Sequence, residues 1–193
     1  MNACNAAVPS LGQTAGDNST QNQAGRDLNI FNYHNQSQLY IQYSQLVKEF
    51  EQELRDGSIT FGEFIEKIQH YTISTDVVGL EAKLTEAGFE CYIDLAKQRK
   101  ESYYKKITES TPSKATQKIH AYVLAKICML FNLHIILAVN SGVSKETIAD
   151  MILEKVIQPV QNILETNNVL NIDYDDLMSM VYFLTGNCHI KWR

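Results

Sequence analysis

Residues 177–192 read LMSMVYFLTGNCHIKW, and the interpretation of the whole chain starts from this stretch. Its first part places apolar residues at the three- and four-residue spacing of one helix face, at Leu177, Met180, Val181 and Leu184. Gly186 follows as a residue type that can take the left-handed conformation with which many helices end. The stretch therefore predicts a helix that stops at Gly186 and is followed by a short apolar end.

That apolar end is unusual, because the last residues of most chains are polar and poorly ordered. It contains Ile190 and Trp192, the single tryptophan of the chain. Side chains of this kind are mostly buried, so one interpretation is that they close the core of the protein itself. The other interpretation makes them part of a surface that docks on a partner. The candidate residues of this partner surface are Gly186, Asn187, His189, Ile190 and Trp192.

Composition predicts an all-α protein with one domain. The chain has 193 residues, of which 45% are hydrophobic, so it is long enough to bury a substantial core. It has only three prolines, and strong helix formers are frequent after residue 36. We expect a compact bundle of about seven helices in residues 36–193, acting as an interaction domain.

Residues 1–35 are expected to form a flexible, disordered tail. They contain seven Asn and three Gln, with few large apolar groups before Ile30. A segment of this composition buries too little surface to offset the entropy of ordering. Residues 22–31 could form a turn followed by a short extended piece, which would suit either a linker or a tail that folds onto a partner.

Apolar periodicity and capping residues place the helices of residues 36–193. The predicted helices cover residues 37–56, a segment that starts at a Thr60 capping box, a segment from the caps at residues 74–76 to Gly88, residues 89–108, residues 114–140, a segment after Ser144 that Pro159 kinks or splits, and a last helix capped by Asp173. Residues 121–139 have the length of a membrane span. They include Lys126 and His134, so we expect a buried central helix and no membrane contact.

Seven basic residues between Leu95 and His120 form a candidate electrostatic patch. Only two acidic residues lie in this segment, which carries +5 in a chain whose net charge is −5. The patch could track the phosphates of a nucleic acid, receive the acidic face of a protein, or be an ordinary solvated surface. Its residues are Lys97, Arg99, Lys100, Lys105, Lys106, Lys114 and Lys118.

No familiar catalytic motif appears in the sequence, so we expect a protein without enzymatic activity, cofactor or metal. Residues 56–64 resemble the second half of an EF-hand calcium loop, but Gln52 and Leu54 would occupy its first and third ligand positions and neither is a carboxylate. Cys128 and His134 are six residues apart, which favours a hydrogen-bonded core histidine over a metal ligand. The four cysteines form no CxxC pair, which is typical of free thiols in the cytoplasm.

The segment from Tyr182 to Trp192, YFLTGNCHIKW, resembles the end of the C-terminal domains of bacterial ABC-three-component conflict systems. This group includes Lamassu-type anti-phage defence. The likeness extends more weakly back through the predicted helix at residues 114–139 to about Gly79. It implies a helical module that associates with an SMC-like ATPase and a further, middle subunit of the same system.

In that family the domain usually follows an effector such as a nuclease, whereas here we expect only a tail before the helices. The effector would then be on another polypeptide, or the protein would be an adaptor. The resemblance carries over no catalytic residue. We expect a cytoplasmic assembly subunit that docks on the ATPase or effector, with homodimer formation possible. The alternative is a nucleic-acid-binding module that uses the basic patch, directly or through the complex.

Overall fold

The computed structural model describes residues 24–57, 65–74, 78–108 and 113–192, with the side chains of residues 24–38 outside the description. The chain divides into two units, Met1–Gln38 and Leu39–Arg193. The second unit carries the features described below. The Thr60 capping box and the caps at residues 75–76 lie outside the described residues.

The described residues are helical and contain no β-strand, which confirms the predicted all-α class. A 3-10 turn precedes α4, and a π-helical segment joins α6 to α7. The elements are α1 (Ala24–Asp56), α2 (Glu66–Thr72), α3 (Leu80–Glu86), η1 (Glu90–Tyr92), α4 (Ile93–Thr108), α5 (Lys114–Asn140), α6 (Lys145–Ile152), η2 (Leu153–Ile157), α7 (Gln158–Leu164) and α8 (Tyr174–Gly186).

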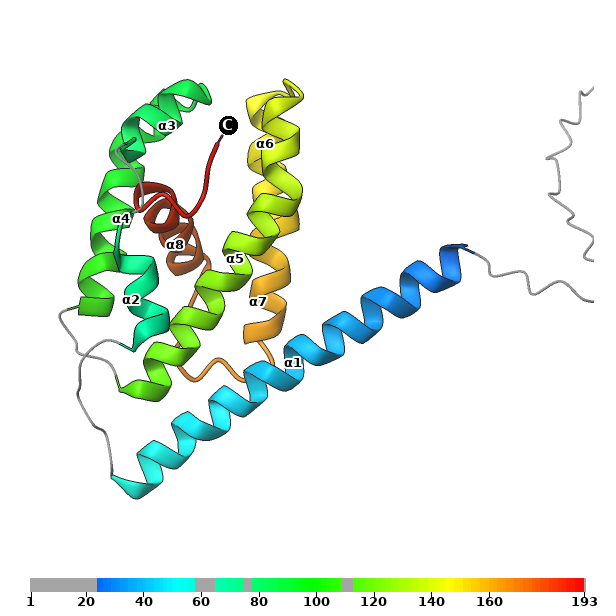
Figure 1. Ribbon diagram of the computed structural model, residues 1–193, viewed down its shortest axis with the longest axis vertical. Coiled ribbons are helices and arrows are strands. Elements are labelled where there is room, and N and C mark those ends of the chain that lie inside the picture. Colours follow the sequence, from blue (N-terminus) through cyan, green and yellow to red (C-terminus); the bar gives the residue numbers. More distant parts are fainter. Residues whose placement is uncertain (1–23, 58–64, 75–77, 109–112, 193) are drawn as a thin grey trace, which may run out of the picture. The chain divides into compact units, whose positions relative to one another are not determined.

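Helix α5 is the central element of the second unit. Figure 1 shows it crossing between α2 and α4 on one side and the α6–α7 helix on the other. It contacts α2, α6, α7 and α8, while α8 also packs along α4. Ile127, Phe131 and Ile135 on its buried face are fully inaccessible to solvent. α5 and α8 therefore join the two sides of the bundle through a common core.

One helix in the described residues, α5, is long and apolar enough to cross a membrane. Core helices of soluble proteins pass the same test of length and composition. Here one face of α5 is buried by neighbouring helices, while Met129, Leu133 and Leu137 on the opposite face are 47 to 67% exposed. Helix α5 is therefore the central helix of the bundle, as expected. Its exposed face is apolar, whereas the sequence analysis expected a buried helix.

Two helix starts differ from the sequence prediction. The first helix begins at Ala24 rather than near residue 37, and residues 26–37 contain no proline or glycine that would interrupt it. The second begins at Glu66 instead of following Thr60. Its first free backbone amide, at Ile65, is satisfied by the Gln117 side chain of α5 at 2.7 Å, so a tertiary contact sets this start.

The predicted break at Pro159 takes the form of a π-helical segment. Pro159 occupies the first turn of α7 and has no N–H to donate to the preceding turn. Just before it, the amide of Gln158 bonds to the carbonyl of Leu153, five residues back. The wider turn relieves the conflict between the proline and the helix, so α6 and α7 continue as one helix with an altered register. Such π segments are frequent at functional sites.

The buried histidine of α5 is His120, not His134 as the sequence suggested. His134 is partly exposed and makes no hydrogen bond with the part of the chain that the structure describes. His120 is 5% exposed, and its Nδ1 lies 3.1 Å from the Tyr103 hydroxyl of α4. Burial lowers the pKa of His120 to about 4, and Lys106 adds to the effect while Asp176 opposes it. His120 is therefore neutral at pH 7.

Candidate functional site

After α8 the C-terminal segment turns at Cys188, not at Gly186 as the sequence predicted. Gly186 is still within α8, and the left-handed residue is Cys188, with φ of 68°. The amide of His189 bonds to the carbonyl of Leu184 at 2.9 Å, which closes the helix end. The side chain of Lys100 crosses over Gly186, so a Cβ there would lie 2.6 Å from its Cδ unless the lysine side chain moved.

The segment then folds back onto the end of α8. The indole Nε1 of Trp192 donates to the Thr185 hydroxyl at 3.1 Å, and that hydroxyl donates to the carbonyl of Val181. The buried Lys83 of α3 donates to the carbonyl of Thr185 at 2.8 Å, where a cation complements the negative end of the helix dipole. This polar cluster satisfies groups that would otherwise be costly to bury.

Aromatic and apolar packing completes the burial of the segment. The Trp192 ring lies between Phe89 and Phe131, with ring centroids 5.2 and 5.1 Å apart, and Ile190 is fully buried. Asn187 is buried as well and donates to the carbonyl of Tyr71 at 2.9 Å.

Among the five residues of the candidate partner surface, His189 is therefore the only one with appreciable exposure, and the other four are buried. The His189 ring packs against His70 and Tyr71. Its backbone carbonyl accepts from the Cys128 thiol. The geometry thus matches the first interpretation of the segment, in which it closes the core. A partner could contact Ile190 directly only after the bundle opened locally, and Trp192 exposes only 4% of its surface.

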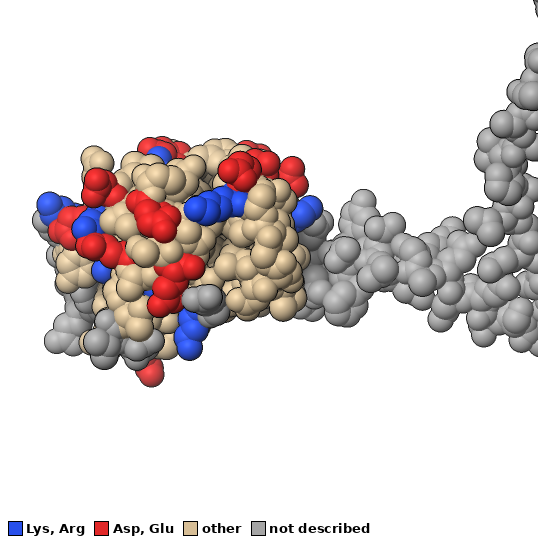
Figure 2. Space-filling model, turned by 90° about the horizontal axis from the view of Figure 1, so that it is seen from above, with Lys and Arg blue, Asp and Glu red and all other residues tan. Residues whose placement is uncertain are grey.

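The candidate basic patch is largely paired with the chain's own carboxylates. Lys97 pairs with Glu81, Arg99 with Asp175, Lys105 with Glu101, Lys106 with Asp176 and Lys118 with Glu49. Lys100 lies over Gly186, and Lys114 starts α5 on the exposed surface. The ion pairs of the patch therefore connect α4 and α5 to α1, α3 and α8. Most of its positive charge is balanced by carboxylates of the same chain. Figure 2 shows acidic and basic side chains interspersed over one face of the molecule.

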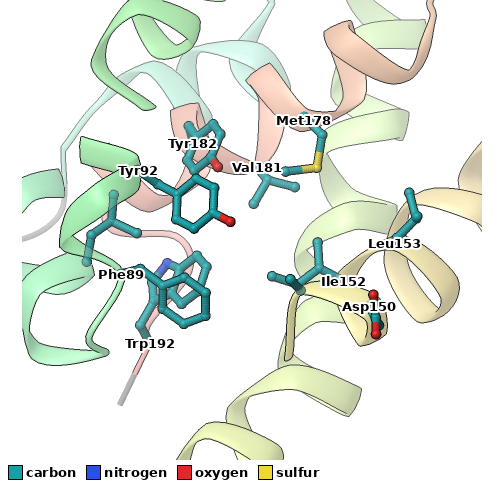
Figure 3. A pocket seen from close by; sticks show the side chains of 11 residues that line it. Phe89, Tyr92, Asp150, Ile152, Leu153, Met178, Val181, Tyr182 and Trp192 are labelled. Atoms are coloured by element: carbon teal, nitrogen blue, oxygen red, sulfur yellow. The ribbon is translucent and has the colours of Figure 1, made fainter. Parts of the chain in front are cut away.

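A hollow above the C-terminal segment was not singled out by the sequence. It has a volume of about 290 Å³ and lies between α3, η1, α6, η2 and α8. Its base is formed by Trp192 and Phe89, with Val181 of α8 beside them. Figure 3 shows Tyr92, Phe89 and Trp192 facing Ile152 and Leu153 across an open space. Tyr92 is 42% and Leu153 49% exposed, so the apolar rim is open to solvent.

Few polar side chains line the hollow. The hydroxyls of Tyr92 and Tyr182 and the carboxylate of Asp150 make no hydrogen bond or ion pair with the described residues, so they could bond to a ligand. A mostly apolar hollow with a few oriented polar groups is typical of a binding site. The π segment that precedes Pro159 begins at Leu153 and so contributes to this rim.

A second, polar hollow lies one turn earlier along α8, between α8 and α4. It is lined by Leu95, Arg99, Asp173, Asp175 and Asp176 among others. Asp173 caps α8 as predicted and forms a capping box with Asp176, whose amide lies 2.9 Å from the Asp173 carboxylate. The two hollows share no lining residue, and we call the apolar one the α8 groove. Its lining contains one carboxylate, Asp150, and no cation, whereas the polar hollow contains Asp173, Asp175, Asp176 and Arg99.

Comparison with protein families gives one match. Residues 79–192 match the family model of C-terminal domain 9 of the ABC-three component (ABC-3C) systems, which covers more than half of the chain. The chain belongs to this family. The match confirms the resemblance seen in residues 182–192. No curated protein and no solved structure matches the chain.

The ABC-3C domain begins one residue before α3 and therefore includes both walls and the base of the α8 groove. Helices α1 and α2 precede the matched region. The groove could not be recognised from the sequence because its residues come from five separate elements. Only their exposure distinguishes Tyr92 and Leu153 from the apolar residues of the core. No group of three or more His, Cys, Asp or Glu that could hold a metal occurs among the described residues.

Proposed function

We propose that this chain is a non-catalytic assembly subunit of an ABC-three-component anti-phage system. It acts in the cytoplasm and docks on the SMC-like ATPase or on an effector subunit. Membership of the ABC-3C family supports a role in such a system. The observation that carries the docking role is the α8 groove, where an apolar hollow and unpaired polar groups remain accessible on a bundle whose other candidate surfaces are used internally.

Recognition of nucleic acid through the basic patch is less well supported. Five of its seven cations lie within 4.0 Å of a carboxylate of the same chain. A phosphate backbone would have to displace these carboxylates, which oppose its approach by like-charge repulsion. The α8 groove is lined by one carboxylate, Asp150, and by no cation, so it offers a phosphate backbone no electrostatic attraction.

Co-expression with the other components of the system tests the proposal. The chain, the ATPase and the middle component are produced together and analysed by size-exclusion chromatography with light scattering. We expect a complex of fixed stoichiometry that contains all three. A chain that elutes alone, as a monomer or homodimer, and that binds a duplex oligonucleotide with a steep salt dependence would contradict the proposal.

A further inference from the structure

The α8 groove combines two properties that together define its occupant. It is lined by apolar groups such as Phe89, Leu153 and Met178, and its volume of about 290 Å³ suits one large apolar side chain. Removal of this surface from water would favour association. Its lining also includes one carboxylate, Asp150 of α6.

The negative charge of Asp150 is not balanced by an ion pair with any of the described residues. Asp150 lies on one exposed face of the α6–η2 helix with Glu146 and Glu154, which are four residues to either side of it. Of these three carboxylates, Glu154 is paired only with the adjacent Lys155, at 3.9 Å. The α6 wall of the groove therefore presents negative charge that a cationic partner would complement.

We propose that the α8 groove receives a basic amphipathic segment of another subunit of the same system, with a large apolar side chain in the hollow above Trp192 and a Lys or Arg on Asp150. This inference rests on the proposed function, because it names the site and the chemistry of the docking. The unpaired hydroxyls of Tyr92 and Tyr182 face the same hollow and can bond to polar groups of the segment. Arg99 remains on Asp175 at 2.6 Å, which leaves Asp150 as the principal anionic contact.

The exposed face of α5 serves as a control, because it is apolar like the groove but lies elsewhere on the bundle. Leu133 and Leu137 are even more exposed than Leu153, at 59 and 67% against 49%. Their neighbours along that face are Met129 and Asn140, and the adjacent Lys126 packs over Tyr122. This face is apolar without acidic residues, so a basic segment would gain no charge complementarity there.

Substitutions in the two surfaces test the inference with the purified ATPase and middle component as probes. Leu153→Asp and Asp150→Lys change the groove, while Leu137→Asp and Glu165→Lys make the same chemical changes at exposed positions elsewhere. We expect the groove variants to weaken the complex at least about tenfold and the controls less than about threefold, since an anchor in a desolvated pocket dominates binding. Wild-type affinity should also fall as salt rises.

A photo-crosslinking residue at position 153, and separately at position 137, gives a second readout that does not depend on variant stability. Crosslinks from position 153 to a basic segment of the ATPase or middle component are expected. If the complex forms but crosslinks only from position 137, or if both groove variants bind as wild type does, the groove is not the docking site although the proposed function survives. If the wild-type chain joins no complex, both proposals fail together.

Discussion

The C-terminal segment, residues 186–192, and the basic patch were the two candidate partner surfaces in the sequence, and the chain uses both internally. They differ in the physical means. The segment is held by burial, with Ile190 and Trp192 in the core, whereas the patch is held by ion pairs at the surface, such as Lys106 with Asp176. Burial of large side chains contributes several kcal/mol, whereas an exposed ion pair contributes about 1 kcal/mol or less. The C-terminal segment is thus an integral part of the core, whereas the side chains of the basic patch can exchange their carboxylate partners.

Replacement of Trp192 should have the largest effect on stability. Trp192→Ala removes a ring that packs on Phe89 and Phe131 and leaves the Thr185 hydroxyl without its donor. We expect a loss of about 3–5 kcal/mol in the free energy of unfolding, measured by urea denaturation. Leu153→Ala, on the open rim of the groove, should change it by less than about 1 kcal/mol. Equal losses would show that the C-terminal segment is not part of the core.

His120 lies near the basic patch, where Lys106 and Asp176 act on its pKa, and it predicts a dependence of stability on pH. Its pKa is lowered to about 4 by burial, while an unfolded histidine titrates near the usual value of 6.5. Between these values the unfolded state binds the proton first, so the contribution is complete above pH 6.5 and is lost as the pH falls toward 4. Wild type should lose about 2 kcal/mol from this group between pH 6.5 and 5.

The comparison of variants isolates this contribution from that of the carboxylates. His120→Gln should show a smaller decrease in unfolding free energy over the same interval, whereas His134→Gln, at a partly exposed position, should follow the wild type. The free energy is measured by urea denaturation at several pH values. Parallel curves for wild type and His120→Gln would mean that His120 is accessible to protons in the folded state.

Much of the fold could be predicted from local signals. The bounds of α5 follow from its apolar periodicity and the Ser113 cap, and the start of α8 follows from Asp173. The errors occur where long-range contacts decide. Gln117 of α5 sets the start of α2, and the left-handed residue after α8 is Cys188 rather than Gly186. Neither feature leaves a periodic trace in the sequence.

The candidate site could not be predicted for a related reason. A sequence shows that residues such as Ile190 and Leu153 are apolar, but not which of them the folded chain covers. The ion pair of Arg99 with Asp175 joins residues far apart in the chain, so charge counting within one segment overestimated the free charge of the patch. Exposure, which defines the α8 groove, is a property of the assembled bundle alone.

The smallest expected effect concerns the basic patch and tests whether its charges are only loosely held. Lys106 lies 2.8 Å from both carboxylate oxygens of Asp176, whereas Lys105 lies 4.0 Å from Glu101. Lys106→Gln should lower the unfolding free energy by about 0.5–1 kcal/mol and Lys105→Gln by less than about 0.3 kcal/mol. The difference should shrink in 1 M salt, where the Debye length is about 3 Å. If Lys106→Gln lowered the unfolding free energy by more than about 2 kcal/mol at every salt concentration, the patch, like the C-terminal segment, would be an integral part of the fold.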